Sequence, residues 1–315
     1  MCMVEAKNMR TISTLAESIT KAASLQTYYT IRFLVDPERV ADAYRAYAYF
    51  RWVDDALDAE SASEEERGEF VQREKFLLES LYRGESIADT NPQEQMLVDL
   101  VHTDTDNNGG LHSYLFNMMS VMEFDVERRG RLITQNELDE YTRWLATAVM
   151  EALHYFIGHD CPAPRDQTRI LAVSAAHIAH MLRDTFDDIR AGYFNIPLEA
   201  LEANQITPQD VKSEPYRDWV KSRVRLARKY FKAGGEYFCR VGSVRCRMAG
   251  FAYRARFAWL LDTIERERFL LRPVYDERKS FVTGVRMVLD TFSSMLSPRM
   301  GTASAQTGPA PERKL

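Results

Sequence analysis

Two stretches of the sequence carry pairs of aspartates at helical spacing. Asp54 and Asp58 stand four residues apart, and so do Asp184 and Asp188. Residues three or four apart lie on one face of an α-helix, so each pair would present two carboxylates in one direction. Carboxylates gathered inside a protein need cations, and oxygen ligands suit Mg2+, which also binds phosphate oxygens readily. The spacing therefore predicts a Mg2+ site for a substrate that carries a diphosphate.

Each aspartate pair continues a stripe that begins with apolar or aromatic residues. The first stripe contains Val40, Tyr44, Tyr47, Arg51, Asp54 and Asp58. The second contains Ile170, Val173, His177, His180, Asp184 and Asp188, with Arg183 and Asp187 beside it. A stripe that starts apolar faces the core, so the carboxylates that continue it should also point inward. The alternative interpretation is two solvated helix faces, in which Arg51 pairs with Asp55 and Arg183 with Asp187.

Such stripes need long helices, and the spacing of apolar residues predicts an all-α protein. Only 11 prolines and 14 glycines occur, and they fall between segments with apolar residues three and four apart. We expect Pro37 to open the first of these helices, with Asp36 as its N-cap. The predicted helices cover residues 37–59, 64–82, 111–130, 135–158, 164–191, 216–241, 244–270 and 275–296, and a loop covers residues 103–110.

Composition and charge limit the class of protein. With 45% hydrophobic residues in 315, the chain can bury a substantial core, and its net charge of -5 argues against binding of nucleic acid. Neither a signal-peptide-like N-terminus nor a run of about 18 apolar residues occurs, so we expect a cytoplasmic protein. The basic segment 217–279 is either a solvated face or a surface for anionic lipid, which would give peripheral membrane association. The cysteines lack metal-binding spacing and should be free thiols; they are Cys2, Cys161, Cys239 and Cys246.

Both aspartate segments resemble motifs of the squalene/phytoene synthase family. The segment YAYFRWVDDALD, from Tyr47 to Asp58, is similar to the first aspartate-rich motif of that family. The segment LRDTFDDIRAGYFNIPLEAL, from Leu182 to Leu201, is similar to the second. Weaker agreement, in family order, covers TYY near Thr27, MEFD ending at Asp125, LxxY from Leu138 to Tyr141, and LLDTIE from Leu260. The resemblance therefore runs through most of the chain.

The resemblance implies a single large helical bundle of the isoprenoid-synthase type with a central active-site cavity. This domain would span residues 21–299, after an N-terminal extension of residues 1–20 and before a disordered tail of residues 300–315. The implied enzyme is a Mg2+-dependent transferase that ionises a C15 or C20 prenyl diphosphate, farnesyl or geranylgeranyl diphosphate. It would join the allylic carbocation head to head to a second prenyl diphosphate, giving a squalene- or phytoene-type product.

The resemblance also implies roles for individual residues. The implied metal ligands are Asp54, Asp55, Asp58, His180, Asp184, Asp187 and Asp188. The implied substrate-binding residues are Thr27, Tyr28, Arg32, Arg51, Arg183 and Arg190. The implied catalytic residues are Tyr47, Arg51, Tyr141 and Arg183, and the two tyrosines would line the cavity, where aromatic faces stabilise cations. Mn2+ is an alternative to Mg2+, and use of NADPH stays open, although no GxGxxG fingerprint occurs.

Five positions depart from the family pattern. Leu25 and Gln26 stand where the family has a Ser/Lys-type diphosphate-binding pair, so a cationic phosphate ligand is missing. Arg32, on the same expected helix as Tyr28, is a candidate replacement. Ahead of the second motif, His177 and His180 replace Gln and Asn of the family pattern. Before the LLDTIE segment, Phe257 replaces a Tyr.

Three other functions stay open from the sequence. The first is a single-substrate terpene cyclase on the same scaffold, because the ionising residues are retained while the second-substrate site is altered. The second is a non-catalytic relative that acts as an assembly protein. The third is a redox-metal site, built from Glu151, His154, His177, His180 and Asp184. The sequence leaves the prenyl chain length, the product and the oligomeric state, monomer or homodimer, undetermined.

Overall fold

The computed structural model describes residues 2–59, 61–105 and 109–275, with side chains from residue 12 onward. Within these ranges the chain forms helices and no strand, which confirms the predicted all-α class. The helices are α1 (Cys2–Ala23), α2 (Leu25–Leu34), η1 (Pro37–Arg39), α3 (Val40–Leu57), α4 (Glu64–Tyr82), α5 (Pro92–His102), α6 (Gly110–Arg128), α7 (Gln135–Phe156), α8 (Leu171–Ala191), α9 (Leu198–Asn204), α10 (Glu214–Arg240) and α11 (Val244–Arg266).

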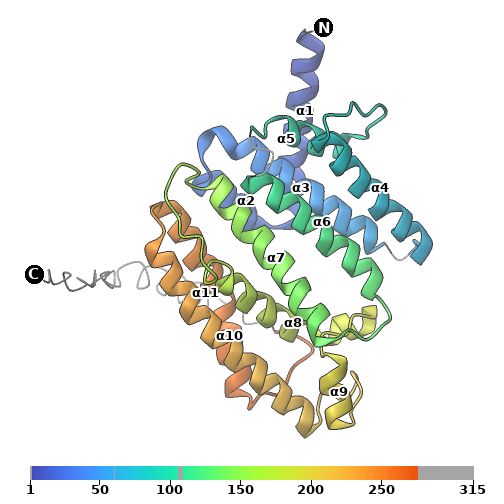
Figure 1. Cartoon of the computed structure of the whole chain (residues 1–315), viewed down its shortest axis with the longest axis vertical. Helices are drawn as coiled ribbons and strands as arrows, with labels where there is room; N and C mark the ends of the chain where they lie inside the picture. The colour runs from blue at the N-terminus through green and yellow to red at the C-terminus, as the bar shows by residue number, and fades with distance from the viewer. Residues whose placement is uncertain (1, 60, 106–108, 276–315) are drawn as a thin grey trace, which may run out of the picture.

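The helices that carry the predicted site residues are neighbours in the packing. Helix α6 packs against both α3 and α7, α7 packs along α8, and α8 is covered by α10 and α11 (Figure 1). Gly234 allows α10 to approach α8 closely, because a Cβ atom there would lie 2.6 Å from the Cβ of Ala172. Helices α3, α6, α7 and α8 therefore bring residues far apart in the sequence into one region.

Several predicted boundaries differ from the observed ones. Pro37 opens the 3-10 turn η1, and the α-helix itself begins at Val40. The helix expected from Pro164 begins at Leu171, because residues 166–170 form a bend and turns. Helices α1, α5 and α9 were not predicted. The predicted helix 275–296, apart from Tyr275, and the tail 300–315 lie outside the described residues.

The N-terminal part of the chain is tied to the bundle. Helix α1 packs on α3, and its Ala16 and Thr20 are fully buried. Residues 12–20, assigned from the sequence to an N-terminal extension, are thus part of a packed helix, while the domain limits themselves stay a prediction.

Expectations from composition can be checked in the described part of the chain. Cys161, Cys239 and Cys246 are free thiols, as expected. No described helix combines the length and the apolar character that crossing a bilayer requires. In the described part of the basic segment, four arginines form ion pairs: Arg228 with Asp262 and Glu265, Arg240 with Asp166, Arg245 with Asp36, and Arg272 with Glu267. These pairs support the solvated-face interpretation, and membrane association stays a prediction.

The sequence suggested Asp36 as the N-cap of the following helix. In the structure it does not cap that helix but joins three parts of the chain. No side-chain hydrogen bond caps η1. Instead, the Asp36 carboxylate accepts the backbone N–H groups of Gly158 (2.9 Å) and His159 (3.1 Å), and it forms an ion pair with Arg245. Burial raises the pKa of Asp36, but the two backbone donors and Arg245 more than offset this, and the pKa falls below its usual 3.8. The carboxylate therefore links the start of α3 to the end of α7 and to α11.

We expect Asp36→Ala to lower the free energy of unfolding at pH 7 by about 2–4 kcal/mol, because two backbone donors and an arginine lose a buried charged partner. The pKa of Asp36 is lower in the folded chain, so this stabilisation is present at neutral pH and is lost as the pH falls below about 4. Urea denaturation at several pH values measures both effects. Glu140→Ala, which removes an exposed pair with Arg143, is the control and should cost less than about 1 kcal/mol. Equal costs for the two variants at pH 7 would contradict the assignment.

Candidate active site

The first aspartate pair lies at the C-terminal end of α3. An earlier turn of this helix buries Tyr44 in the core, and the same side of the helix carries Arg51, seven residues later, and Asp54. Arg51 Nη1 lies 3.1 Å from Asp54 Oδ2, and Arg51 also pairs with the more exposed Asp55. Both interpretations of the first motif are therefore partly right: Arg51 forms the expected surface pair and also contacts the inward carboxylate.

The second aspartate pair lies in the last turns of α8. The guanidinium of Arg183 donates two hydrogen bonds of 2.6 Å to the carboxylate of Asp184, which fixes the direction of that side chain. One turn further, Asp188 Oδ2 accepts a 2.7 Å hydrogen bond from Asn195 Nδ2. Arg183 therefore pairs with Asp184 rather than with Asp187, the partner in the solvated-face interpretation.

A hydrogen-bond network on α6 and α7 extends to the second motif. Asp125, on α6, accepts hydrogen bonds from Arg128 Nε (2.7 Å) and from the hydroxyl of Tyr141 (3.1 Å) on α7. Arg128 Nη1 then donates a 2.8 Å bond to Asn195 Oδ1, and Asn195 in turn binds Asp188. Helices α6, α7 and α8 and the loop after α8 thus contribute to one continuous set of hydrogen bonds.

Asp125, Arg128 and Asn195 were not assigned as site residues from the sequence. Asp125 and Arg128 stand three apart in EFDVERR, which is the spacing of a helical ion pair. Asn195 lies in the segment YFNIP after α8. Sequence spacing could have suggested the Asp–Arg pair, whereas the contact between Arg128 and Asn195 depends on how α6 and α8 end beside each other.

The carboxylates of α3, α6 and α8 act on one another electrostatically. Burial, with repulsion from Asp58 and Asp125, raises the pKa of Asp54 to about 6, although Arg51 opposes the shift. Burial, with repulsion from Asp184 and Asp125, raises the pKa of Asp188 to about 7, against the effect of Arg128 and Asn195. Asp125 affects the aspartates of both motifs, so it lies between them. The site is therefore short of positive charge when both motifs are ionised.

These residues fit Mg2+ that is shared with a phosphorylated ligand. No group of three or more His, Cys, Asp or Glu side chains in the described ranges is arranged to hold a metal alone. Mg2+ does not need such a group, because it commonly keeps water ligands and binds one or two carboxylates together with substrate phosphates. Carboxyls with raised pKa values gain most from a nearby cation, since it favours their charged form. The residues in reach of such ions are Asp54, Asp58, Asp184 and Asp188.

Three predicted site residues lie away from this centre. Asp187 pairs with Arg190, and both side chains are mostly exposed, on the outer face of α8. Asp55 is also more than half exposed, in its pair with Arg51. The structure thus separates the inward aspartates Asp54 and Asp184 from these outward ones, although the predicted metal ligands included all of them.

The predicted substrate-binding residues of α2 lie beside the early part of α3. Thr27 donates its backbone N–H and its hydroxyl to Ser24, the N-cap of α2. The ring of Tyr28 stacks on that of Tyr44 at 5.8 Å. Tyr44 precedes Asp54 by ten residues, which is about 15 Å along a helix. Thr27 and Tyr28 therefore lie near one end of the first stripe, and Asp54 lies near the other.

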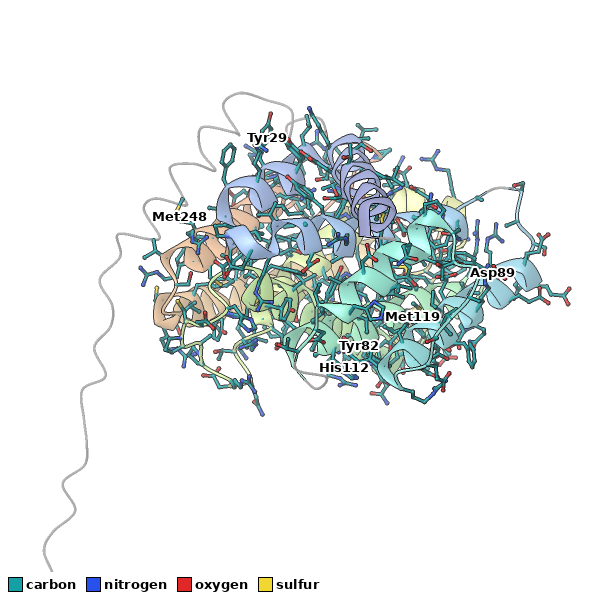
Figure 2. The ribbon with its side chains drawn as sticks, turned by 90° about the horizontal axis from the view of Figure 1, so that it is seen from above. Tyr29, Tyr82, Asp89, His112, Met119 and Met248 are labelled. Carbon is teal, nitrogen blue, oxygen red and sulfur yellow. The ribbon has the colours of Figure 1, made fainter. Side chains whose placement is uncertain are left out.

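Arg32 also belongs to this end. It is exposed, and it lowers the pKa of Tyr44, which burial and Glu17 raise to about 12. Leu25 is 58% exposed, and Tyr29, on the same helix, points to the surface (Figure 2). No described contact of Arg32 brings it to the aspartates, so its role as the replacement phosphate ligand stays a prediction.

The two histidines ahead of the second motif have different surroundings. His177 is buried against the ring of Tyr141, at 5.2 Å between centroids, and burial lowers its pKa to about 3. His180 is half exposed; its Nε2 lies 2.5 Å from Arg183 Nη2 and 3.4 Å from Asp184 Oδ2. The ring centroids of His180 and Phe257 lie 6.1 Å apart. His180 therefore contacts both Arg183 and Asp184, whereas His177 lies in the interior.

The alternative redox-metal site is not assembled in the described part of the chain. Glu151 pairs with Arg169 at 2.8 Å. His154 Nε2 shares a 2.8 Å hydrogen bond with the hydroxyl of Tyr237, and Cys246 Sγ lies 3.6 Å from its Nδ1. A redox metal in a helical bundle depends on several protein ligands that converge. These residues are instead engaged with other partners.

The comparisons with known proteins agree with this arrangement. The sequence profile of the squalene/phytoene synthase family matches residues 20–282, so the chain belongs to this family. A curated relative, the chloroplastic phytoene synthase of Daucus carota, is 24% identical over 271 residues. That match covers 82% of this chain and 65% of the relative, so the chain spans slightly less than two thirds of the relative's length.

Solved structures of the same architecture are also similar. The crystal structure of a squalene synthase from Alicyclobacillus acidocaldarius matches with a TM-score of 0.67 and 19% identity, over 84% of this chain and 97% of that one. A dehydrosqualene synthase in complex with a ligand matches with a TM-score of 0.67 and 18% identity, over 91% and 96% of the two chains. These similarities confirm the isoprenoid-synthase fold implied by the sequence motifs.

The raised pKa of Asp188 leads to a stability prediction for the metal-free protein. The folded chain binds a proton at Asp188 near pH 7, well above the pH at which an unfolded aspartate does. Ionised Asp188 therefore destabilises the fold at pH 8. We expect Asp188→Asn to be more stable than the unaltered protein at pH 8, on the order of 2 kcal/mol.

This difference should shrink as the pH falls from about 7 towards 4, because an unfolded Asp188 also takes up a proton near pH 4 and the cost of protonating the folded carboxyl then disappears. Urea denaturation in the presence of EDTA measures it. Asp139→Asn, an exposed aspartate on α7, is the matched control and should give a difference near zero at each pH. A constant difference for Asp188→Asn across this range would contradict the charge repulsion described here.

Proposed function

We propose that this protein is a Mg2+-dependent prenyl transferase. It ionises a C15 or C20 prenyl diphosphate and joins the resulting allylic carbocation head to head to a second prenyl diphosphate. The observation that carries the proposal is the meeting of inward carboxylates from α3, α6 and α8, three of which, Asp54, Asp125 and Asp188, have raised pKa values. Such a site binds cations and, through them, the diphosphate group of a substrate. The family supports the reaction type, since its members transfer prenyl groups.

The chain's own residues prepare this site for ionisation of an allylic diphosphate. Bound Mg2+ would neutralise the leaving diphosphate and the aspartates at the same time. Arg51 and Arg183 stand beside the carboxylates and fix their directions. Their remaining N–H groups could reach the oxygens of a diphosphate held there, because a guanidinium carries five donors.

Tyr141 has a supporting role that the sequence alone did not indicate. Its hydroxyl donates to Asp125, and Arg128 covers one face of its ring at 4.6 Å. The ring thereby positions Asp125 between the two motifs. Only the opposite face of Tyr141 could contact a cationic intermediate. Tyr47, half-buried one turn before Arg51 on α3, is the second aromatic candidate.

The product of the purified protein tests the proposal directly. Incubation with Mg2+ and farnesyl or geranylgeranyl diphosphate should release inorganic diphosphate and give an organic product with twice the carbon number of the substrate. A product of unchanged carbon number would establish the single-substrate cyclase instead. If neither substrate releases diphosphate, the result would favour the non-catalytic assembly protein.

We expect Asp54→Asn and Asp184→Asn each to lower turnover at least 100-fold, because each removes a charge that binds Mg2+ for ionisation. Diphosphate release at saturating Mg2+ measures the effect, and circular dichroism checks the fold. Asp139→Asn, an exposed aspartate of α7, serves as the charge-matched control. Turnover within threefold of the unaltered protein in both site variants would rule out the proposed site.

His180→Asn should keep Mg2+-dependent activity or improve it. Asparagine supplies an oxygen acceptor for Arg183, in place of the imidazole nitrogen, and oxygen suits Mg2+ better than imidazole does. The dependence of turnover on Mg2+ concentration measures this. A correctly folded but inactive variant would show that the imidazole itself has a distinct role.

A further inference from the structure

Arg129 lies where the two helices with site carboxylates end side by side. It is the first residue after α6, and its extended backbone turns the chain away from the helix. The next residue, Gly130, donates its N–H to the carbonyl of Gly192 at 2.8 Å. Gly192, in a left-handed conformation, ends α8, and a Cβ atom there would lie 3.7 Å from Arg129 Cγ. The side chain of Arg129 therefore starts between the C-terminal ends of α6 and α8.

The guanidinium of Arg129 has a buried donor without a partner. Its Nη1 atom is inaccessible to solvent and makes no hydrogen bond. Within the described ranges, no carboxylate lies within ion-pair distance of Arg129. By contrast, three other arginines at the site each pair with an aspartate: Arg51, Arg128 and Arg183. A buried cationic donor without a partner is costly, and a ligand bound beside Arg129 would satisfy it.

The neighbours of Arg129 place it at the aspartate site. Its Cζ lies 5.7 Å from the ring centroid of Tyr193, and Arg128 lies 4.8 Å from the same ring. The backbone N–H of Tyr193 donates a 2.7 Å hydrogen bond to the carbonyl of Asp188, and Arg128 pairs with Asp125. Tyr193 therefore lies beside the aspartate site and in contact with Arg129.

An anionic ligand at this place must tolerate the carboxylates. Asp58 and Asp125 would repel a free anion, whereas a diphosphate that arrives with Mg2+ brings its own positive charge. A guanidinium at the edge can then bind the phosphate oxygens through two parallel N–H groups.

We propose that Arg129 binds the diphosphate group of the substrate at the aspartate site. This inference rests on the proposed function, because it assumes that the ligand of the aspartate site is a diphosphate with Mg2+. A purely structural role is the alternative, since a cation also stabilises the C-terminal end of a helix such as α6. That role would change the melting temperature and leave ligand affinity unchanged.

Isothermal titration of the purified protein with inorganic diphosphate, in excess Mg2+ at pH 8, separates the two roles. Arg129→Gln should weaken diphosphate binding by about 10- to 100-fold, the size expected for a lost charged hydrogen-bond partner. Arg129→Lys keeps the charge but not the fork, so its affinity should fall between the two. The matched control is Arg143→Gln, which removes an exposed arginine of α7 and should bind as the unaltered protein does.

Diphosphate affinity that is unchanged in Arg129→Gln, or weakened equally in Arg143→Gln, would overturn the inference, and so would failure of the unaltered protein to bind diphosphate. Should Arg129→Gln fail to fold, Arg129→Lys decides alone: a wild-type affinity overturns the inference and a weaker one supports it. The proposed function is judged separately, by diphosphate release from a prenyl diphosphate. If the enzyme is active but its Arg129 variants bind diphosphate normally, the proposed function stands and the proposed role of Arg129 is wrong.

Discussion

Repulsion among partly buried carboxylates is the constraint on which this structure depends. Helices α3, α6 and α8 each direct aspartates into one region, and burial with mutual repulsion raises the pKa of Asp54 to about 6 and that of Asp188 to about 7. The chain offsets part of this cost with Arg51, Arg128 and Arg183. The remainder makes the site cation-seeking, so the feature that destabilises the metal-free fold also gives the site its affinity for a metal-bound diphosphate.

The helical packing keeps these carboxylates in place. Asp125, fixed by Arg128 and Tyr141, stands between the two motifs, and Asn195 extends the same hydrogen-bond network to Asp188. Gly234 lets α10 pack closely behind α8, which holds the second motif from its other side. Side chains that are already held by hydrogen bonds reorganise less when charge develops during ionisation, which is the general advantage of preorganised sites.

The long helices and the inward aspartates could be predicted because both follow from periodic spacing along one helix. Other features needed tertiary contacts. Asp36 has the sequence of an N-cap, yet it binds the end of α7 because that backbone reaches it. The contact of Arg128 with Asn195 depends on two helix ends meeting. Helix α5 was missed although Asn91, Pro92 and Glu94 form a recognisable capping box at its start. Spacing placed Asp188 on the inward stripe and Asp187 beside it, whereas the resemblance assigned both as metal ligands, and Asp187 is exposed.

The most direct test of the central claim is a crystal structure with Mn2+ and an unreactive prenyl thiodiphosphate, in which anomalous scattering locates the metal ions. The account predicts Mn2+ between the carboxylates of Asp54 and Asp58 on α3 and those of Asp184 and Asp188 on α8, with diphosphate oxygens completing the coordination. Mn2+ bound instead at Glu151 and His154, or found at neither aspartate pair in a crystal that contains the ligand, would contradict it.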